Sequence, residues 1–187
     1  MLPFTAVVFV LRRVLLAVVA ALVFLGAPSA PSAPDVALGA SHAQPFIWPT
    51  IGRITQPFGC TGFKLEPPRG KCAHFHYGVD IASNLGTPVY AAAAGVVTIA
   101  GWDPWLNHDP DWMVLIRNAN GYQTMYAHLK VNLAKGIRKG AHVKQGQLIG
   151  WIGMTGRTTG PHVEWGVFLH HKPVNPLLYV QGKLQRR

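Results

Sequence analysis

Residues 112–129 read WMVLIRNANGYQTMYAHL, in which two apolar runs flank the dipeptide Asn120-Gly121. Both runs are rich in the β-branched and aromatic residues that pack well on a pleated sheet. Asn-Gly between such runs is the strongest short-range signal for a β-hairpin, because both residues accept the left-handed backbone conformation that a tight turn needs. The stretch therefore predicts two antiparallel strands, over residues 112–117 and 122–129.

Similar short runs occur on both sides of this hairpin, separated by many of the 20 glycines and 15 prolines of the chain. None is followed by a helical pattern long enough to connect parallel strands. The sequence thus predicts an all-β fold built from antiparallel strands. Outside the hairpin, the expected strands cover residues 52–58, 78–82, 88–91, 95–101, 147–152 and 163–169.

The composition indicates a single folded domain with a basic surface. The chain has 187 residues, of which 49% are hydrophobic and only 13% are charged, and this excludes a disordered chain. Its 17 Lys and Arg against 7 Asp and Glu give a net charge of +10, which favours an anionic partner such as a cell wall. The basic residues are scattered and form no repeated basic-aromatic motif, so we expect no nucleic-acid partner. We expect the protein to act as a monomer.

The N-terminal segment is typical of an export signal or a membrane anchor. Residues 1–26 are apolar apart from Arg12 and Arg13, and the apolar run after the arginines is shorter than the roughly 20 residues of a spanning helix. A linker rich in Ala, Pro and Ser follows over residues 27–47, and a small-x-small cleavage pattern occurs at 41–43. Two alternatives stay open: a cleaved signal peptide, or an uncleaved anchor with the linker as its stalk.

Both alternatives place the rest of the chain outside the cytoplasm, either secreted or tethered to the outer face of the cell membrane. Residues 48–180 form the expected β domain, and residues 181–187 form a basic tail that we expect to be loose.

The two cysteines, Cys60 and Cys72, lie 12 residues apart. In an oxidising compartment the simplest interpretation is a disulfide that closes a surface loop. A free pair and a metal-thiolate site are the alternatives, and the spacing is unlike that of a zinc knuckle.

Histidines and the scarce acidic residues suggest a metal site. His162 and Glu164 are two apart, so on a strand their side chains point to the same face. Asp80 follows His76 by four residues. Imidazole and carboxylate groups gathered in one cleft could hold a catalytic zinc ion with one position open to water. Such pairs also arise by chance, and most histidines in a β domain are surface or core groups.

A series of motifs in this order resembles the lysostaphin-like (LytM-type) zinc metallopeptidases of bacterial cell walls. The resemblance covers residues 50–180, and it implies a small antiparallel β-sheet domain with a groove over the sheet for a peptide stem or cross-bridge of peptidoglycan. The motifs are FHYGVDIA at 75–82, GTPVYAAAAGVV at 86–97, YAHL at 126–129, GQLIG at 146–150, TTGPH at 158–162 and KPVNP at 172–176.

The resemblance also implies a role for each matching residue. His76 and Asp80 correspond to the first two zinc ligands, and His128 and His162 correspond to the catalytic histidines. The position of the third ligand, a histidine in the family, is Glu164 here.

The expected activity is that of a zinc metallo-endopeptidase with one zinc ion per chain, acting on peptide bonds of peptidoglycan. Glutamate is an accepted zinc ligand, but two carboxylates weaken the metal as a Lewis acid and let manganese compete better than at the usual site. The alternative is an inactive domain that binds cell wall or regulates a partner hydrolase. For the bond that is cleaved, the alternatives are those of a D,D-type and of a glycyl-type endopeptidase.

Overall fold

The computed structural model describes residues 46–104 and 110–186, and almost all of their regular structure is β. The expected N-terminal helix and most of the linker lie outside the described residues. Within the described ranges, no helix is long and apolar enough to cross a membrane. The elements are β1 (Arg53–Gln56), β2 (Gly59–Cys60), β3 (Phe75–His76), β4 (Gly78–Ala82), β5 (Pro88–Tyr90), β6 (Gly95–Trp102), β7 (Trp112–Asn118), β8 (Tyr122–Ala127), β9 (His142–Val143), β10 (Leu148–Trp151), β11 (His162–Leu169), β12 (Lys172–Val174) and the 3-10 helix η1 (Pro176–Leu178).

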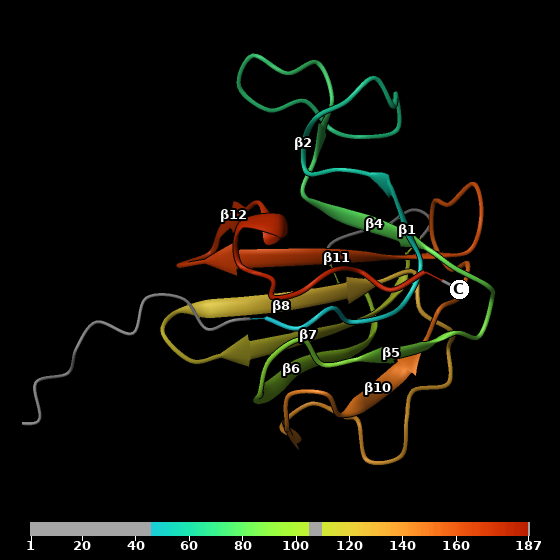
Figure 1. The fold of residues 1–187 in the computed structure, drawn as a ribbon, viewed down its shortest axis with the longest axis vertical. Coiled ribbons are helices and arrows are strands. Elements are labelled where there is room, and N and C mark those ends of the chain that lie inside the picture. Colours follow the sequence, from blue (N-terminus) through green and yellow to red (C-terminus); the bar gives the residue numbers. More distant parts are fainter. Residues whose placement is uncertain (1–45, 105–109, 187) are drawn as a thin grey trace, which may run out of the picture. The chain divides into compact units, whose positions relative to one another are not determined.

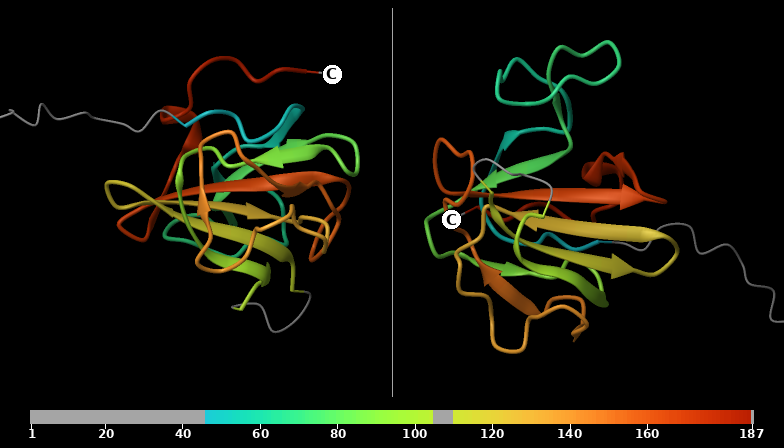
Figure 2. Two further views of the ribbon diagram at one scale, coloured as in Figure 1. Left: turned by 90° about the horizontal axis from the view of Figure 1, so that it is seen from below. Right: turned by 180° about the vertical axis from the view of Figure 1, so that it is seen from behind.

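One antiparallel sheet organises the fold. Its strands lie in the order β1-β4-β11-β8-β7-β6-β9, and β12 pairs with β11. Strands β11, β8, β7 and β6 run side by side in each view (Figures 1 and 2). Two small antiparallel sheets, β10-β5 and β2-β3, complete the structure. The all-β antiparallel prediction is confirmed, and each stretch expected to form a strand contains one.

The decisive hairpin forms as the sequence predicts. Strands β7 and β8 pair antiparallel, with Arg117 opposite Gln123 next to the turn. Asn120 and Gly121 have φ angles of 56° and 77°, both left-handed. The amide of Tyr122 donates a hydrogen bond of 3.1 Å to the carbonyl of Ala119. Two successive left-handed residues match the twist of the flanking strands, which explains why Asn-Gly specifies this turn.

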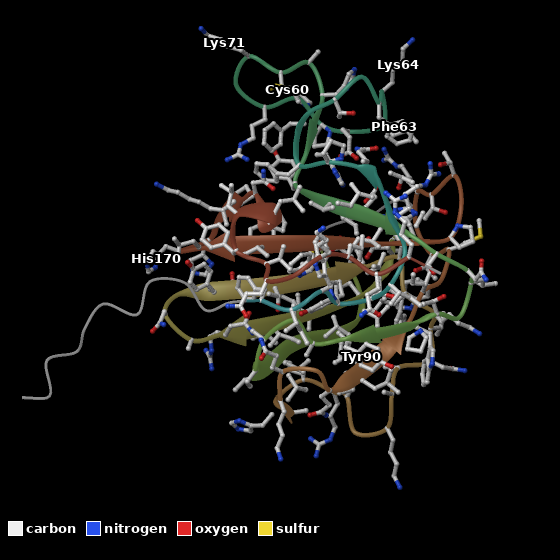
Figure 3. The ribbon with its side chains drawn as sticks, in the orientation of Figure 1. Cys60, Phe63, Lys64, Lys71, Tyr90 and His170 are labelled. Atoms are coloured by element: carbon white, nitrogen blue, oxygen red, sulfur yellow. A yellow bond between two sulfur atoms is a disulfide. The ribbon has the colours of Figure 1, made fainter. Side chains whose placement is uncertain are left out.

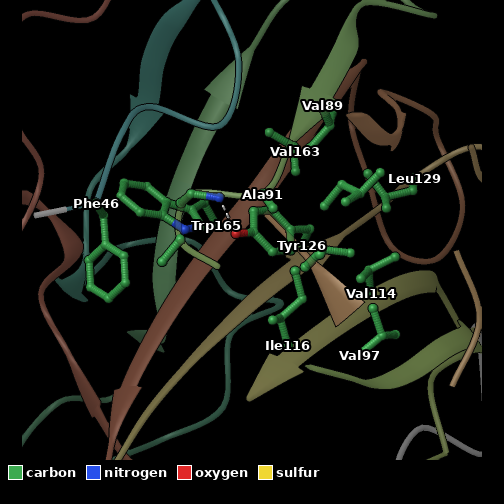
Figure 4. Packing of buried hydrophobic residues seen from close by; sticks show 14 of the residues in the cluster. Phe46, Val89, Ala91, Val97, Val114, Ile116, Tyr126, Leu129, Val163 and Trp165 are labelled. Carbon is green, nitrogen blue, oxygen red and sulfur yellow. Dashed lines mark hydrogen bonds between the residues drawn. The ribbon is translucent and has the colours of Figure 1, made fainter. Parts of the chain in front are cut away.

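Alternate side chains of the central strands form the main core on one face of the sheet. Val114, Tyr126 and Trp165 are fully buried there, and burial of each such side chain contributes about 1.5–3 kcal/mol (Figure 4). The hydroxyl of Tyr126 accepts a hydrogen bond of 2.6 Å from the amide of Ala92, so the only polar atom of this side chain is satisfied. Phe46, which the sequence places in the linker, packs edge-on against Trp165 in the same core.

The disulfide expected between Cys60 and Cys72 is present. It closes a loop that carries Phe63, Lys64 and Lys71 and projects from the domain (Figure 3). In the chain-entropy model, closing a loop of this length stabilises the fold by about 3 kcal/mol.

The expectation of a loose C-terminal tail is wrong. The carbonyl of Gln185 accepts a hydrogen bond of 2.9 Å from the amide of Gly52, and that of Gly182 accepts one of 3.0 Å from the indole of Trp48. Leu184 also packs against the main core. Polar composition alone predicts a loose tail, but backbone hydrogen bonds and the side chain of Leu184 hold residues 181–185 to the domain.

Candidate metal centre

His76 and Asp80 come from two consecutive strands, β3 and β4. The ring of His76 is buried, and its Nδ1 donates to the carbonyl of Pro57 at 3.2 Å. Because a carbonyl can only accept, this contact places the proton on Nδ1 and leaves the Nε2 lone pair for a metal. Nε2 lies 3.2 Å from Oδ1 of Asp80.

Sheet register brings Glu164 to the same point. Glu164 on β11 is the direct cross-strand partner of Asp80 on β4. Its Oε1 lies 3.5 Å from Nε2 of His76. Ligand-type atoms of the three residues all lie within 4.8 Å of one another. One imidazole nitrogen and two carboxylates at this spacing fit a divalent cation such as Zn²⁺.

His128 and His162 stand beside this cluster, with ring centroids 4.7 Å apart. His128 follows the last residue of β8 and has a φ of 60°, a conformation that non-glycine residues adopt mainly where the surrounding structure enforces it. Its Nδ1 donates to the carbonyl of Thr155 at 2.8 Å, and that of His162 donates to the carbonyl of Gly160 at 2.9 Å. Both rings therefore present Nε2 to the cluster: these atoms lie 3.8 Å from Glu164 Oε2 and 3.6 Å from Asp80 Oδ1, respectively.

Without a metal ion, His76 and Glu164 hold protons at pH 7. Burial alone lowers the pKa of His76, but the hydrogen bond to Asp80 and the charge of Glu164 together raise that pKa to about 9. Burial raises the pKa of Glu164 to about 8. Burial and the neighbouring His162 lower the pKa of His128 to about 4, so this ring is neutral at pH 7. A metal ion that binds here must displace the protons of His76 and Glu164, so its affinity falls as the pH falls.

Glu66 is a further carboxylate at the site, which the sequence did not indicate. It lines the same cavity of about 210 Å³ as His76, Asp80 and Glu164. Gln56 Nε2 donates to its Oε1 at 3.0 Å, and His74 Nδ1 donates to its backbone carbonyl at 2.8 Å. His74 thus holds the disulfide loop in place. The position of Glu66 depends on how this loop folds over the sheet, and no periodic pattern in the sequence encodes that.

Asp111 is the second residue that the sequence did not indicate. Its side chain is buried, and its Oδ2 lies 3.8 Å from Nδ1 of His128. Its Oδ1 makes no hydrogen bond within the described ranges. Burial, together with the charge of Asp103, raises the pKa of Asp111 to about 7. The scarcity of acidic residues was the one available signal, since four of the seven in the chain line this site: Glu66, Asp80, Asp111 and Glu164.

Replacing Asp111 with asparagine is expected to stabilise the metal-free protein at pH 8 and to have little effect near pH 4. The raised pKa means that the folded state binds this proton more tightly than the unfolded chain. The contribution of Asp111 to the free energy of unfolding therefore falls as the pH rises from about 4 to about 7. Asp111→Asn abolishes this pH-dependent contribution. We expect a gain of about 1–3 kcal/mol at pH 8, measured by urea unfolding in the presence of a chelator.

Asp103→Asn is the matched control, because it retains Asp111 but removes the like charge that contributes to its raised pKa. It should weaken the pH dependence without abolishing it. Identical pH dependence in wild type and Asp111→Asn would contradict this account.

Comparison with known proteins shows the family of the chain. Residues 74–176 match the family model described as peptidase family M23. Over 140 residues the chain is 36% identical to the DD-carboxypeptidase/endopeptidase Mpg of Neisseria meningitidis, an alignment that covers 74% of this chain and 29% of Mpg.

Two solved structures share the fold. A zinc-containing peptidase from Vibrio cholerae is 29% identical with a TM-score of 0.59, over 76% of this chain and 41% of that one. The catalytic domain of lysostaphin from Staphylococcus simulans is 29% identical with a TM-score of 0.54, over 68% of this chain and 91% of the domain. The chain spans less than a third of the length of the curated relatives named Mpg, and most of the length of the lysostaphin domain.

Proposed function

Because the chain belongs to peptidase family M23, we propose that it is a zinc-dependent endopeptidase that hydrolyses peptide bonds in peptidoglycan. The observation that carries the proposal is the convergence of His76, Asp80 and Glu164 within 4.8 Å, with the ring pair of His128 and His162 beside them. Relatives named as peptidoglycan DD-endopeptidases, such as ShyA of Vibrio cholerae at 40% identity over 61% of this chain and 25% of ShyA, support the substrate class.

In this proposal His76, Asp80 and Glu164 hold one zinc ion per chain. When bound, zinc supplies a Lewis acid that polarises the scissile carbonyl and acidifies the attacking water. The neutral ring of His128 offers its Nε2 lone pair to that water and takes up its proton there. His162 faces the same space through Nε2, where a proton on this atom would hydrogen-bond the developing oxyanion, and the proton taken up by His128 would pass to the leaving amine. The carbonyls of Thr155 and Gly160 fix both rings through Nδ1.

Glu164 in place of a histidine changes the charge and the metal preference of the proposed centre. Two carboxylates neutralise more of the metal charge than one does, and their oxygen atoms favour a harder ion. Manganese is therefore a competitor for this site. The same residue is the reason to keep a second candidate function, that of an inactive domain that binds wall peptide or regulates a partner hydrolase.

A wall substrate also fits the rest of the chain. The apolar N-terminal segment would place the domain outside the cytoplasm, secreted or anchored, and the net charge of +10 would draw it to an anionic wall. We propose that it acts there as a monomer.

Elemental analysis of the protein purified without added metal, followed by turnover of purified peptidoglycan, tests the proposal. Close to one zinc ion per chain together with release of new amino groups is the expected result. Bound metal without release of amino groups would favour the inactive binding domain. No metal, even after incubation with zinc or manganese, would overturn the hydrolase proposal.

A further inference from the structure

The face of the sheet that carries the metal centre also carries apolar side chains. In β11, Val163 and Trp165 are buried in the main core, so Glu164 between them points to the opposite face. A second, smaller apolar cluster lies on that opposite face, because its members alternate with core residues along β7 and β8. It comprises Met113, Leu115 and Ala127, with Ile99 and Met125 packed against them.

Three residues of this cluster, Ile99, Leu115 and Met125, line a cavity of about 770 Å³, which we call the apolar groove. Its apolar lining comes from four strands: Ile99 on β6, Leu115 on β7, Met125 on β8 and Phe168 on β11. Large apolar side chains gathered in one open depression usually mark a binding surface. Methionine in particular adapts its shape to different apolar ligands.

Two glycines, which have no side chains, lie on the sheet between the groove and the metal centre. Gly166 and Gly78 are direct cross-strand partners on β11 and β4. A Cβ atom on Gly166 would lie 3.1 Å from Cε of Met125 and 3.2 Å from the ring of Phe168. A Cβ atom on Gly78 would lie 2.9 Å from Cγ of Glu164. Because Gly166 has no side chain, Met125 and Phe168 can pack over it. Because Gly78 has none, there is room for the side chain of Glu164.

The apolar groove adjoins the metal-centre cavity. Glu66 and Glu164 line both of them. A peptide extended across the metal centre in this direction therefore enters the groove, where its side chains meet alkyl and aromatic groups.

We propose that the apolar groove holds the side chains of the substrate peptide on one side of the scissile bond, and that it selects peptides with alkyl side chains over glycine-only peptides. This inference rests on the proposed function, since it takes the metal centre as the place of cleavage. Each methyl group of the peptide that becomes buried strengthens binding by about fourfold, whereas glycine has no side chain to bury.

Peptide binding to the full-length chain carrying His162→Ala, which slows cleavage, tests the inference. The probes are tetraglycine and tetra-alanine, the latter as both the all-L and the all-D peptide, each titrated with and without zinc. We expect at least one tetra-alanine peptide to bind about tenfold or more tightly than tetraglycine. Equal affinities, or no measurable binding of either peptide, would overturn the inference.

Met125→Gln on the same background keeps the length of the side chain but makes the groove lining polar. It should reduce the ratio of the affinity for tetra-alanine to the affinity for tetraglycine to about twofold. Phe168→Gln on the neighbouring strand should have the same effect. Leu178→Gln is the matched control, because Leu178 is 76% exposed on η1 and does not line the groove, so its ratio should stay at the wild-type value.

Two outcomes separate this inference from its alternatives. If Met125→Gln leaves the ratio unchanged but converts a dimer to a monomer in sedimentation, the groove binds a second copy of the chain and the inference fails. If wild type releases no amino groups from peptidoglycan while the peptide ratio behaves as expected, the proposed hydrolase function fails and the selectivity of the groove stands.

Discussion

Glu164→Ala is expected to weaken zinc binding by about 100-fold or more and to abolish hydrolysis. Loss of a partner that only supports a metal ligand costs 10- to 100-fold in affinity, and Glu164 in our proposal is itself a ligand. Its Oε1 lies 3.5 Å from Nε2 of His76, and no neighbouring residue of β11 can replace it, because Val163 and Trp165 point into the core. Competition with a chelator of known affinity measures the effect.

Glu66→Gln is the control for this prediction. Glu66 lines the same cavity but lies outside the cluster of His76, Asp80 and Glu164, so its removal should leave one zinc ion bound per chain. Unchanged zinc affinity in Glu164→Ala would contradict the proposed ligand set.

Glu164→His is expected to have the opposite effect on hydrolysis to Glu164→Ala. An imidazole at this position retains a ligand but removes one negative charge from the site. We expect it to bind zinc, to discriminate more strongly against manganese, and to raise the rate of hydrolysis. Slower hydrolysis at full zinc occupancy would show that the cavity is shaped for the carboxylate.

His128→Ala and His162→Ala are each expected to lower kcat by about 100- to 10,000-fold while the zinc content stays at one ion per chain. Their Nε2 atoms face the cluster, but neither residue belongs to the set of three ligands. The two rings lie 4.7 Å apart and act in the same proton transfers. The loss of kcat in the double variant should therefore be much smaller than the product of the two single losses.

Activity and elemental analysis of the same samples separate catalysis from metal binding. His142→Ala, at an exposed position on β9, is the control and should retain both properties. A change in kcat within a few-fold for either catalytic variant would remove that histidine from the proton-transfer role.

Features that depend on neighbours along the chain follow from local sequence alone. Asn120-Gly121 specifies the turn between β7 and β8 because its two left-handed residues need only local contacts. Alternation along a strand predicts that His162 and Glu164 share a face, and in the structure both side chains line the cavity of the candidate metal centre. The strands that the sequence did not predict have only two or three residues each, too few for a clear alternation: β2, β3, β9 and β12.

Which of these local features meet depends on how the whole chain folds. Asp80 and Glu164 are 84 positions apart in the chain and become partners through the register of β4 and β11. Glu66 and Asp111 reach the site from loops, and the apolar groove exists because side chains of four different strands share the open face. The physical reason is that turn conformation and alternation act over a few residues, whereas strand register and loop packing are set by the burial of the whole core.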